Sequence, residues 1–77
     1  MHELSLMQAV VEMAAEAAGE RRVKRVVLDI GRGAAVLPDA MRFCFELASA
    51  DTPIHGAQLD IIESEGDHLR LKELEVA

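Results

Sequence analysis

The 77-residue sequence predicts an α+β fold, with two helices on one face of a three-stranded mixed β-sheet, in the order helix, strand, helix, strand, strand. Two segments repeat apolar residues at three- and four-residue spacing, and three short segments alternate apolar with polar residues. The strand–helix–strand unit favours a right-handed parallel crossover. The short link at residues 64–67 favours an antiparallel hairpin between the last two strands.

The first helix is expected over residues 4–19, because its apolar side chains fall on one face. Glu12, Glu16 and Glu20 recur every four residues on the opposite face. This spacing is typical of a solvated helix surface rather than of a carboxylate cluster that binds a ligand. Gly19 is the expected C-terminal stop.

The first strand is expected over residues 23–30, which are rich in β-branched side chains. Alternation assigns its residues to two faces, with Val26, Leu28 and Ile30 on one and Val27 and Asp29 on the other. Because both helices are expected on one face, Val27 and the later Ile62 should point to an open face. An open apolar face would favour a partner surface or a homodimer.

The second helix is expected from Pro38 to about Ala50, since proline is tolerated in a first turn. Its polar stripe is narrow, which predicts that it is the more buried of the two helices. The expected apolar positions are Met41, Phe43, Cys44, Phe45, Leu47 and Ala48. Cys44 is interpreted as a small core residue rather than as a reactive thiol.

The last two strands are expected over residues 57–62 and 68–76. Leu69 and Leu71 share one phase of the alternation, whereas Leu74 and Val76 follow the other. A β-bulge at residues 72–73 would return all four side chains to the core face.

Composition and charge exclude several classes of protein. The net charge of −6 and the absence of Trp and Tyr argue against a nucleic-acid partner. No apolar stretch approaches the roughly 20 residues that span a bilayer, and no signal peptide is recognisable, so no membrane partner is expected. With one cysteine and 77 residues, we expect a single cytoplasmic domain over residues 1–77.

The first three residues, Met1, His2 and Glu3, group a free amine, backbone amides and an imidazole. Nitrogen donors in this arrangement suit a square-planar ion such as Ni(II) or Cu(II). The imidazole and the ionised amide of His2 form one chelate ring, and the Met1 amine or the Glu3 amide adds a second. From these residues alone, a frayed terminus with no metal remains open.

The order of motifs resembles the HypA/HybF family of nickel metallochaperones. The Met-His-Glu start is followed by segments similar to the family's first strand, second helix and last two strands, at residues 26–31, 37–46, 56–61 and 69–76. The resemblance implies that Met1, His2 and Glu3 form a Ni(II) site with His2 as its central ligand. It also implies a metallochaperone and not an enzyme, with a HypB-type hydrogenase-maturation GTPase and a nickel-enzyme precursor (hydrogenase or urease) as partners.

One part of the family pattern is missing. The family carries a zinc-binding insert with two Cys-x-x-Cys pairs between its last two strands, and here residues 64–68 connect those strands directly. No zinc is therefore expected in this chain.

Other candidate residues have simpler interpretations. His55 is expected at the surface, and His68 could reach a metal only if its turn lies near the N-terminus. Gly31 and Gly33 flank an arginine after a strand, but the pattern lacks the rest of a phosphate loop and is expected to allow positive φ in a turn. The alternative functions are a shortened interaction module that dimerises without metal, or a small enzyme with a paired base and nucleophile.

Overall fold

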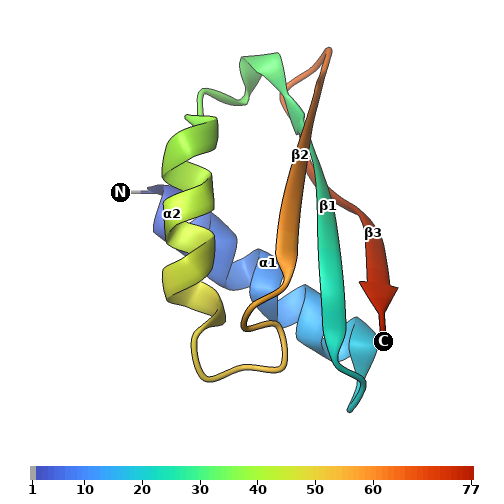
Figure 1. The fold of residues 1–77 in the computed structure, drawn as a ribbon. Coiled ribbons are helices and arrows are strands. Elements are labelled where there is room, and N and C mark those ends of the chain that lie inside the picture. The colour runs from blue at the N-terminus through green and yellow to red at the C-terminus, as the bar shows by residue number, and fades with distance from the viewer. Residues whose placement is uncertain (1) are drawn as a thin grey trace.

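A computed structural model describes residues 2–77 and confirms the α+β class. Both helices lie on one side of a three-stranded mixed sheet (Figure 1). In chain order the elements are α1 (His2–Ala18), β1 (Val23–Gly31), a 3-10 turn η1 (Arg32–Ala34), α2 (Pro38–Ser49), β2 (Gln58–Ser64) and β3 (Leu69–Val76). Within residues 2–77, no helix has the length and apolar character needed to cross a membrane.

The strand order is β2-β1-β3, so the predicted hairpin between the last two strands is wrong. β1 lies between them, parallel to β2 and antiparallel to β3. The physical reason is burial: residues 26–31 of β1 are all buried, as expected of a central strand with near-continuous apolar character. A hairpin would have left this strand at an edge.

The chain therefore crosses the end of β1 on its way from β2 to β3. The Gly31 N–H donates to the His68 carbonyl at 2.8 Å, and the Gly33 N–H donates to the Gly66 carbonyl at 2.7 Å. A Cβ on Gly31 would lie only 2.3 Å from the Gly66 oxygen. Gly31 has φ −71°, so its role is close backbone approach and not the positive φ that we expected.

Helix α1 begins two residues earlier than predicted and therefore includes His2 and Glu3. It ends at Gly19 as expected: φ is +65°, and the Gly19 N–H donates to the Ala15 carbonyl at 3.1 Å. Its buried side chains are Met7, Val10, Val11, Ala14 and Ala18. Glu12, Glu16 and Glu20 face solvent, as predicted.

Helix α2 is slightly the more buried helix, as predicted, with four of its 12 residues buried against five of 17 in α1. Two of its apolar residues are nevertheless exposed. Met41, Cys44 and Phe45 are buried, but Phe43 is 64% exposed and Leu47 is 54% exposed. One side of α2 packs on α1 and the sheet, and residues 43 and 47 lie on the other side because one helical turn separates them. The prediction that Cys44 belongs to the core is confirmed.

The predicted bulge in β3 is confirmed at Lys72. Val27 pairs with Glu73 and Leu28 pairs with Leu71, so Lys72 has no partner in β1. The extra residue changes the phase of the strand. Both halves of β3 can therefore pack against the core through Leu69, Leu71, Leu74 and Val76.

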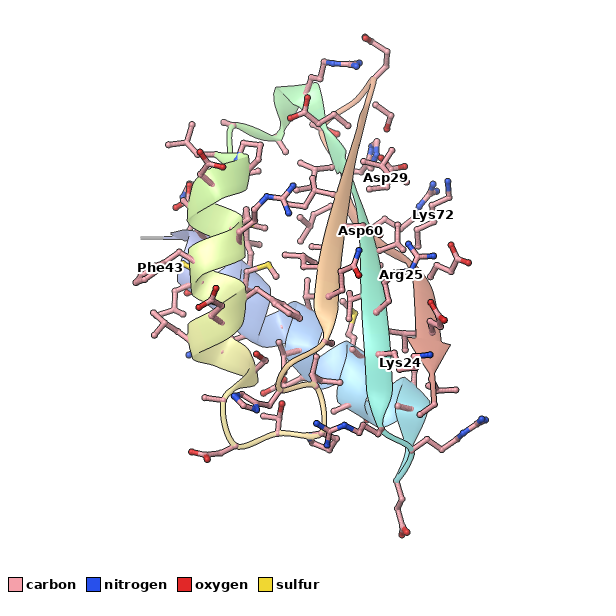
Figure 2. The ribbon with its side chains drawn as sticks, in the orientation of Figure 1. Lys24, Arg25, Asp29, Phe43, Asp60 and Lys72 are labelled. Atoms are coloured by element: carbon pink, nitrogen blue, oxygen red, sulfur yellow. The ribbon has the colours of Figure 1, made fainter. Side chains whose placement is uncertain are left out.

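The face of the sheet opposite the helices is polar, which corrects the expected apolar surface. Arg25, Asp29 and Asp60 lie on this side, away from α1 and α2 (Figure 2). Val27 is buried, while Ile62 remains exposed. An isolated exposed isoleucine is ordinary on a protein surface and does not by itself indicate a dimer.

Candidate metal site and polar cluster

The predicted metal ligands lie in the first turn of α1. The His2 side chain is 59% exposed, whereas the Glu3 side chain is 13% exposed. Their closest charged atoms, His2 Nε2 and Glu3 Oε2, are 3.9 Å apart. Met1, the third predicted ligand, lies outside the described residues. The structure thus places an accessible imidazole beside a carboxylate at a helix start.

The backbone at this position offers further donors. The first four N–H groups of an α-helix have no acceptor within the helix, and these include the amides of His2 and Glu3. The helix dipole places partial positive charge here, which favours anionic donors such as a carboxylate or an ionised amide. Backbone and side-chain donors are therefore both available without breaking a helical hydrogen bond.

A second histidine lies in a cluster around the buried carboxylate of Asp29. The Ser64 hydroxyl donates to Asp29 Oδ1 at 2.6 Å, and Arg70 donates to Asp29 Oδ2 at 3.1 Å. His68 Nε2 lies 3.2 Å from Asp29 Oδ1 and 3.1 Å from the Ser64 hydroxyl. The hydrogen bond from Ser64, followed by that from His68, lowers the pKa of Asp29 below its ordinary value.

This cluster holds a serine, a histidine and an aspartate but does not have the geometry of a hydrolytic triad. In a triad the serine donates to the imidazole, and the carboxylate binds the other imidazole nitrogen. Here Ser64 donates to the carboxylate, and one nitrogen of His68 faces both groups. Arg70 also neutralises the carboxylate. The arrangement ties the ends of β1, β2 and β3 together and activates no nucleophile.

The cluster around Asp29 was not predicted, because the expected strand order was wrong. The crossing brings Ser64 and His68 to the end of β1, where Asp29 is located. The available signal was Asp29 itself, a carboxylate in an otherwise apolar strand. A buried carboxylate requires hydrogen-bond partners, which had to come from the neighbouring strands.

His2 and His68 lie on different sides of the sheet. The first turn of α1 is on the helix side, whereas Asp29, which contacts His68, points from the opposite face (Figure 2). Among residues 2–77, no three His, Cys, Asp or Glu side chains are grouped closely enough to hold a metal ion. Any site at His2 must therefore draw on backbone nitrogens or on Met1.

His55 is exposed, as predicted, in the loop between α2 and β2. It borders a shallow open pocket of about 400 Å³ whose other lining residues are Phe45, Glu46, Ser49, Gly56 and Ala57. One imidazole and one carboxylate at an open surface make an incomplete metal site. His55 therefore serves as a natural reference for His2.

Arg25 organises a second charge group on the open face. Its guanidinium donates to Asp60 and to Glu75, which belong to the two flanking strands. The pKa of Asp60 is lowered first by a hydrogen bond from Gln58 and then by Arg25. These contacts place paired charges across all three strands.

Comparison with known proteins places the fold and the N-terminus in context. Residues 1–76 match a protein-family model described as "Hydrogenase/urease nickel incorporation, metallochaperone, hypA". The hydrogenase maturation factor HypA of Crocosphaera subtropica is 47% identical over 66 residues, which cover 86% of this chain and 58% of that protein. The HypA of Geotalea uraniireducens is 51% identical over 59 residues, covering 77% and 54%. The chain thus spans just over half the length of these relatives.

Two solved structures share the fold. The solution structure of the Ni metallochaperone HypA from Helicobacter pylori matches with a TM-score of 0.75 and 20% identity, covering all of this chain and 87% of the other. A second structure, described as the solution structure of HypA protein, gives a TM-score of 0.81 at 20% identity and covers 97% of that chain. At this identity the likeness concerns the fold alone.

Proposed function

The chain belongs to the HypA family, and on that premise we propose that it is a nickel metallochaperone domain that binds Ni(II) at its N-terminus for insertion into hydrogenase or urease. The observation that carries the proposal is the position of His2. Its imidazole is exposed at a helix start whose amides have no helical acceptor, and Glu3 lies beside it. The proposed role is transport of an ion by ligand exchange, with no covalent chemistry.

The proposed coordination uses Met1 and His2 as a tridentate chelate. The Met1 amine and the His2 amide nitrogen close a five-membered ring with the ion, and the same amide and the His2 imidazole close a six-membered ring. Neither ring requires residues beyond His2 to leave the helix. The fourth donor proposed for the square plane is the Glu3 carboxylate, which lies on the same helical turn, 3.9 Å from Nε2 of the imidazole.

The site is exposed, and protonation of its ionised amide would release the ion. Nickel binding at such a site releases protons, so affinity rises with pH and falls when the amide is protonated again. A partner that offers competing donors can approach the exposed imidazole directly. These properties suit a carrier more than a storage site.

The proposed partners are a HypB-type maturation GTPase and the nickel-enzyme precursor, in the cytoplasm. Support comes from the family description and from relatives named as hydrogenase maturation factors. We further propose that residues 1–77 act as one nickel-binding domain without a zinc module. In support, four residues, 65–68, connect β2 to β3.

A nickel titration of the untagged chain, followed by visible absorption, tests the proposal. We expect one equivalent of Ni(II) to give the yellow band of a low-spin square-planar complex. His2→Ala should abolish that band, and the matched variant His55→Ala should keep it, because His55 is equally a surface histidine.

Equal binding by the His2→Ala variant would reject the N-terminal site. If no form binds nickel and the mass of the chain increases with concentration, the domain would instead be a metal-independent interaction module.

A further inference from the structure

The outer side of α2 carries an apolar stripe in which Phe43 and Leu47 are exposed and Ala40 is half-buried among residues 2–77. Ala40, Phe43 and Leu47 follow one another at three- and four-residue spacing, so they form a continuous strip along the helix. Phe43 points away from the sheet and the rest of the core (Figure 2). Single exposed apolar residues are common, but an exposed phenylalanine and leucine one turn apart form a patch.

Acidic side chains flank this stripe. Asp39 lies one turn before Phe43 and Glu46 lies one turn after it. Both are exposed, and neither side chain has a hydrogen-bond or ion-pair partner among residues 2–77. The four helical neighbours of Phe43 are therefore two carboxylates and two apolar side chains.

The basic residue of α2 does not neutralise this surface. Arg42 is turned toward the sheet, where its guanidinium donates to the Leu59 carbonyl of β2 at 3.2 Å. The acidic flank therefore keeps its charge, in a chain whose net charge is already −6. An aromatic centre with unpaired charges at its rim is typical of an interface that selects its partner by charge.

We propose that the α2 stripe, formed by Asp39, Ala40, Phe43, Glu46 and Leu47, docks a partner protein through an apolar pocket or helix flanked by lysine or arginine. Phe43 fills the apolar centre, while Asp39 and Glu46 pair with the basic flanks. A second copy of this chain fits poorly, because a symmetric contact would place the two acidic rims against each other. This proposal uses none of the predicted nickel ligands and goes beyond the proposed nickel function.

The probe for this surface is a pair of synthetic amphipathic helical peptides of about five turns. Both carry the same leucine stripe, flanked by lysine in one and by glutamate in the other. Fluorescence anisotropy measures their affinity for the full chain, and amide NMR shifts locate the contact. We expect the lysine-flanked peptide to bind at α2 and the glutamate-flanked peptide not to bind.

Matched variants distinguish binding at the α2 stripe from nonspecific hydrophobic binding elsewhere on the surface. Phe43→Ser should lower the affinity of the chain for the lysine-flanked peptide at least about fivefold. Met13→Ser and Ile62→Ser, which remove exposed apolar residues on α1 and on the open sheet face, should leave affinity unchanged. Asp39→Asn with Glu46→Gln should weaken binding and flatten its dependence on salt, whereas Glu12→Gln should not.

Three results would overturn the proposal: equal binding of the two peptides, equal loss in the Phe43→Ser and Met13→Ser variants, or self-association that Phe43→Ser abolishes. Urea unfolding of each variant confirms that the fold is intact, which is expected because Phe43 is outside the core. Nickel absorption by Phe43→Ser should match that of the unaltered chain. Failure of the docking surface is thereby distinguished from failure of the nickel site.

Discussion

His2 and His68 occupy contrasting environments in this small fold. The His2 side chain is 59% exposed in the first turn of a helix, and among residues 2–77 its one ion-pair neighbour is Glu3, at 3.9 Å. His68 is 35% exposed and is held within 3.2 Å of both Asp29 and Ser64. The Nε2 atom of His68 is engaged by two partners and would have to give them up to bind an ion, whereas the imidazole of His2 has no hydrogen-bond partner among residues 2–77.

The two histidines therefore differ in how far the fold satisfies the polar atoms around them. The His68 region is fixed by the crossing of residues 65–68 over β1, and its polar atoms are satisfied within the fold. The His2 region has free amides and an accessible side chain. Substitutions confined to one of the two regions test this contrast.

The largest effect is expected for Gly31→Ala. The added Cβ would lie 2.3 Å from the Gly66 carbonyl oxygen, and backbone on both sides must move. We expect the free energy of unfolding to fall by more than about 3 kcal/mol, as for severe overpacking. Urea denaturation followed by circular dichroism measures it.

Gly19→Ala is the control, because Gly19 has positive φ but open space around it. Its expected cost is only about 1 kcal/mol. Similar losses at the two positions would mean that close approach at the crossing is not what holds the His68 region.

The next largest effect is a difference between the two histidine variants: one should lose nickel affinity and the other should lose stability. His2→Ala should weaken nickel binding at least about 100-fold, since it removes a direct ligand, and leave the urea midpoint unchanged. His68→Ala should lower the urea midpoint, because Asp29 and Ser64 lose a partner, and keep nickel affinity within about twofold. Nickel titration and urea denaturation of the same two proteins provide both readouts. Loss of nickel affinity in both variants would contradict the different roles assigned to the two histidines.

A smaller effect concerns acid stability. The pKa values of Asp29 and Asp60 are lowered in the folded state, mainly by hydrogen bonds from Ser64 and Gln58 respectively. Their contribution to stability is present above the unfolded value of about 3.8 and is lost as pH falls below it. We expect the urea midpoint to decline below about pH 4.

Asp29→Asn should remove part of that acid-dependent decline while lowering stability at neutral pH. Glu12→Gln, at an exposed mid-helix position whose side chain has no hydrogen-bond or ion-pair partner among residues 2–77, serves as the control and should not alter the profile. An unchanged acid profile in Asp29→Asn would contradict the role assigned to the cluster.

The smallest effect is expected for His55→Gln. His55 is exposed in a loop and borders only an open pocket. Both the urea midpoint and nickel affinity should stay unchanged within error. A measurable change in nickel affinity would show that an exposed histidine anywhere on this acidic surface contributes, and the special status of His2 would be lost.

The sequence predicted the elements well because local patterns determine them. Gly19 ended α1 where an αL cap was expected, and the phase change in β3 located the bulge at Lys72. The family resemblance also followed from motif order and is confirmed. These features depend on neighbouring residues along the chain.

Non-local features were harder to predict. The strand order was wrong because a short link usually makes a hairpin, whereas the strongly apolar β1 required the centre of the sheet. That error also concealed the cluster around Asp29. The exposure of Phe43 was not predicted because apolar residues occupy most of the circumference of α2. Only packing decides which of them face solvent.

The most direct test of the account observes all three histidines in one sample. Long-range nitrogen–proton NMR spectra during a Ni(II) titration report each imidazole separately, and a square-planar low-spin complex leaves them visible. If nickel binds at His2, the His2 resonances should shift and saturate at one equivalent while those of His55 and His68 remain in place. Movement of the His68 resonances at the same nickel concentration would contradict it.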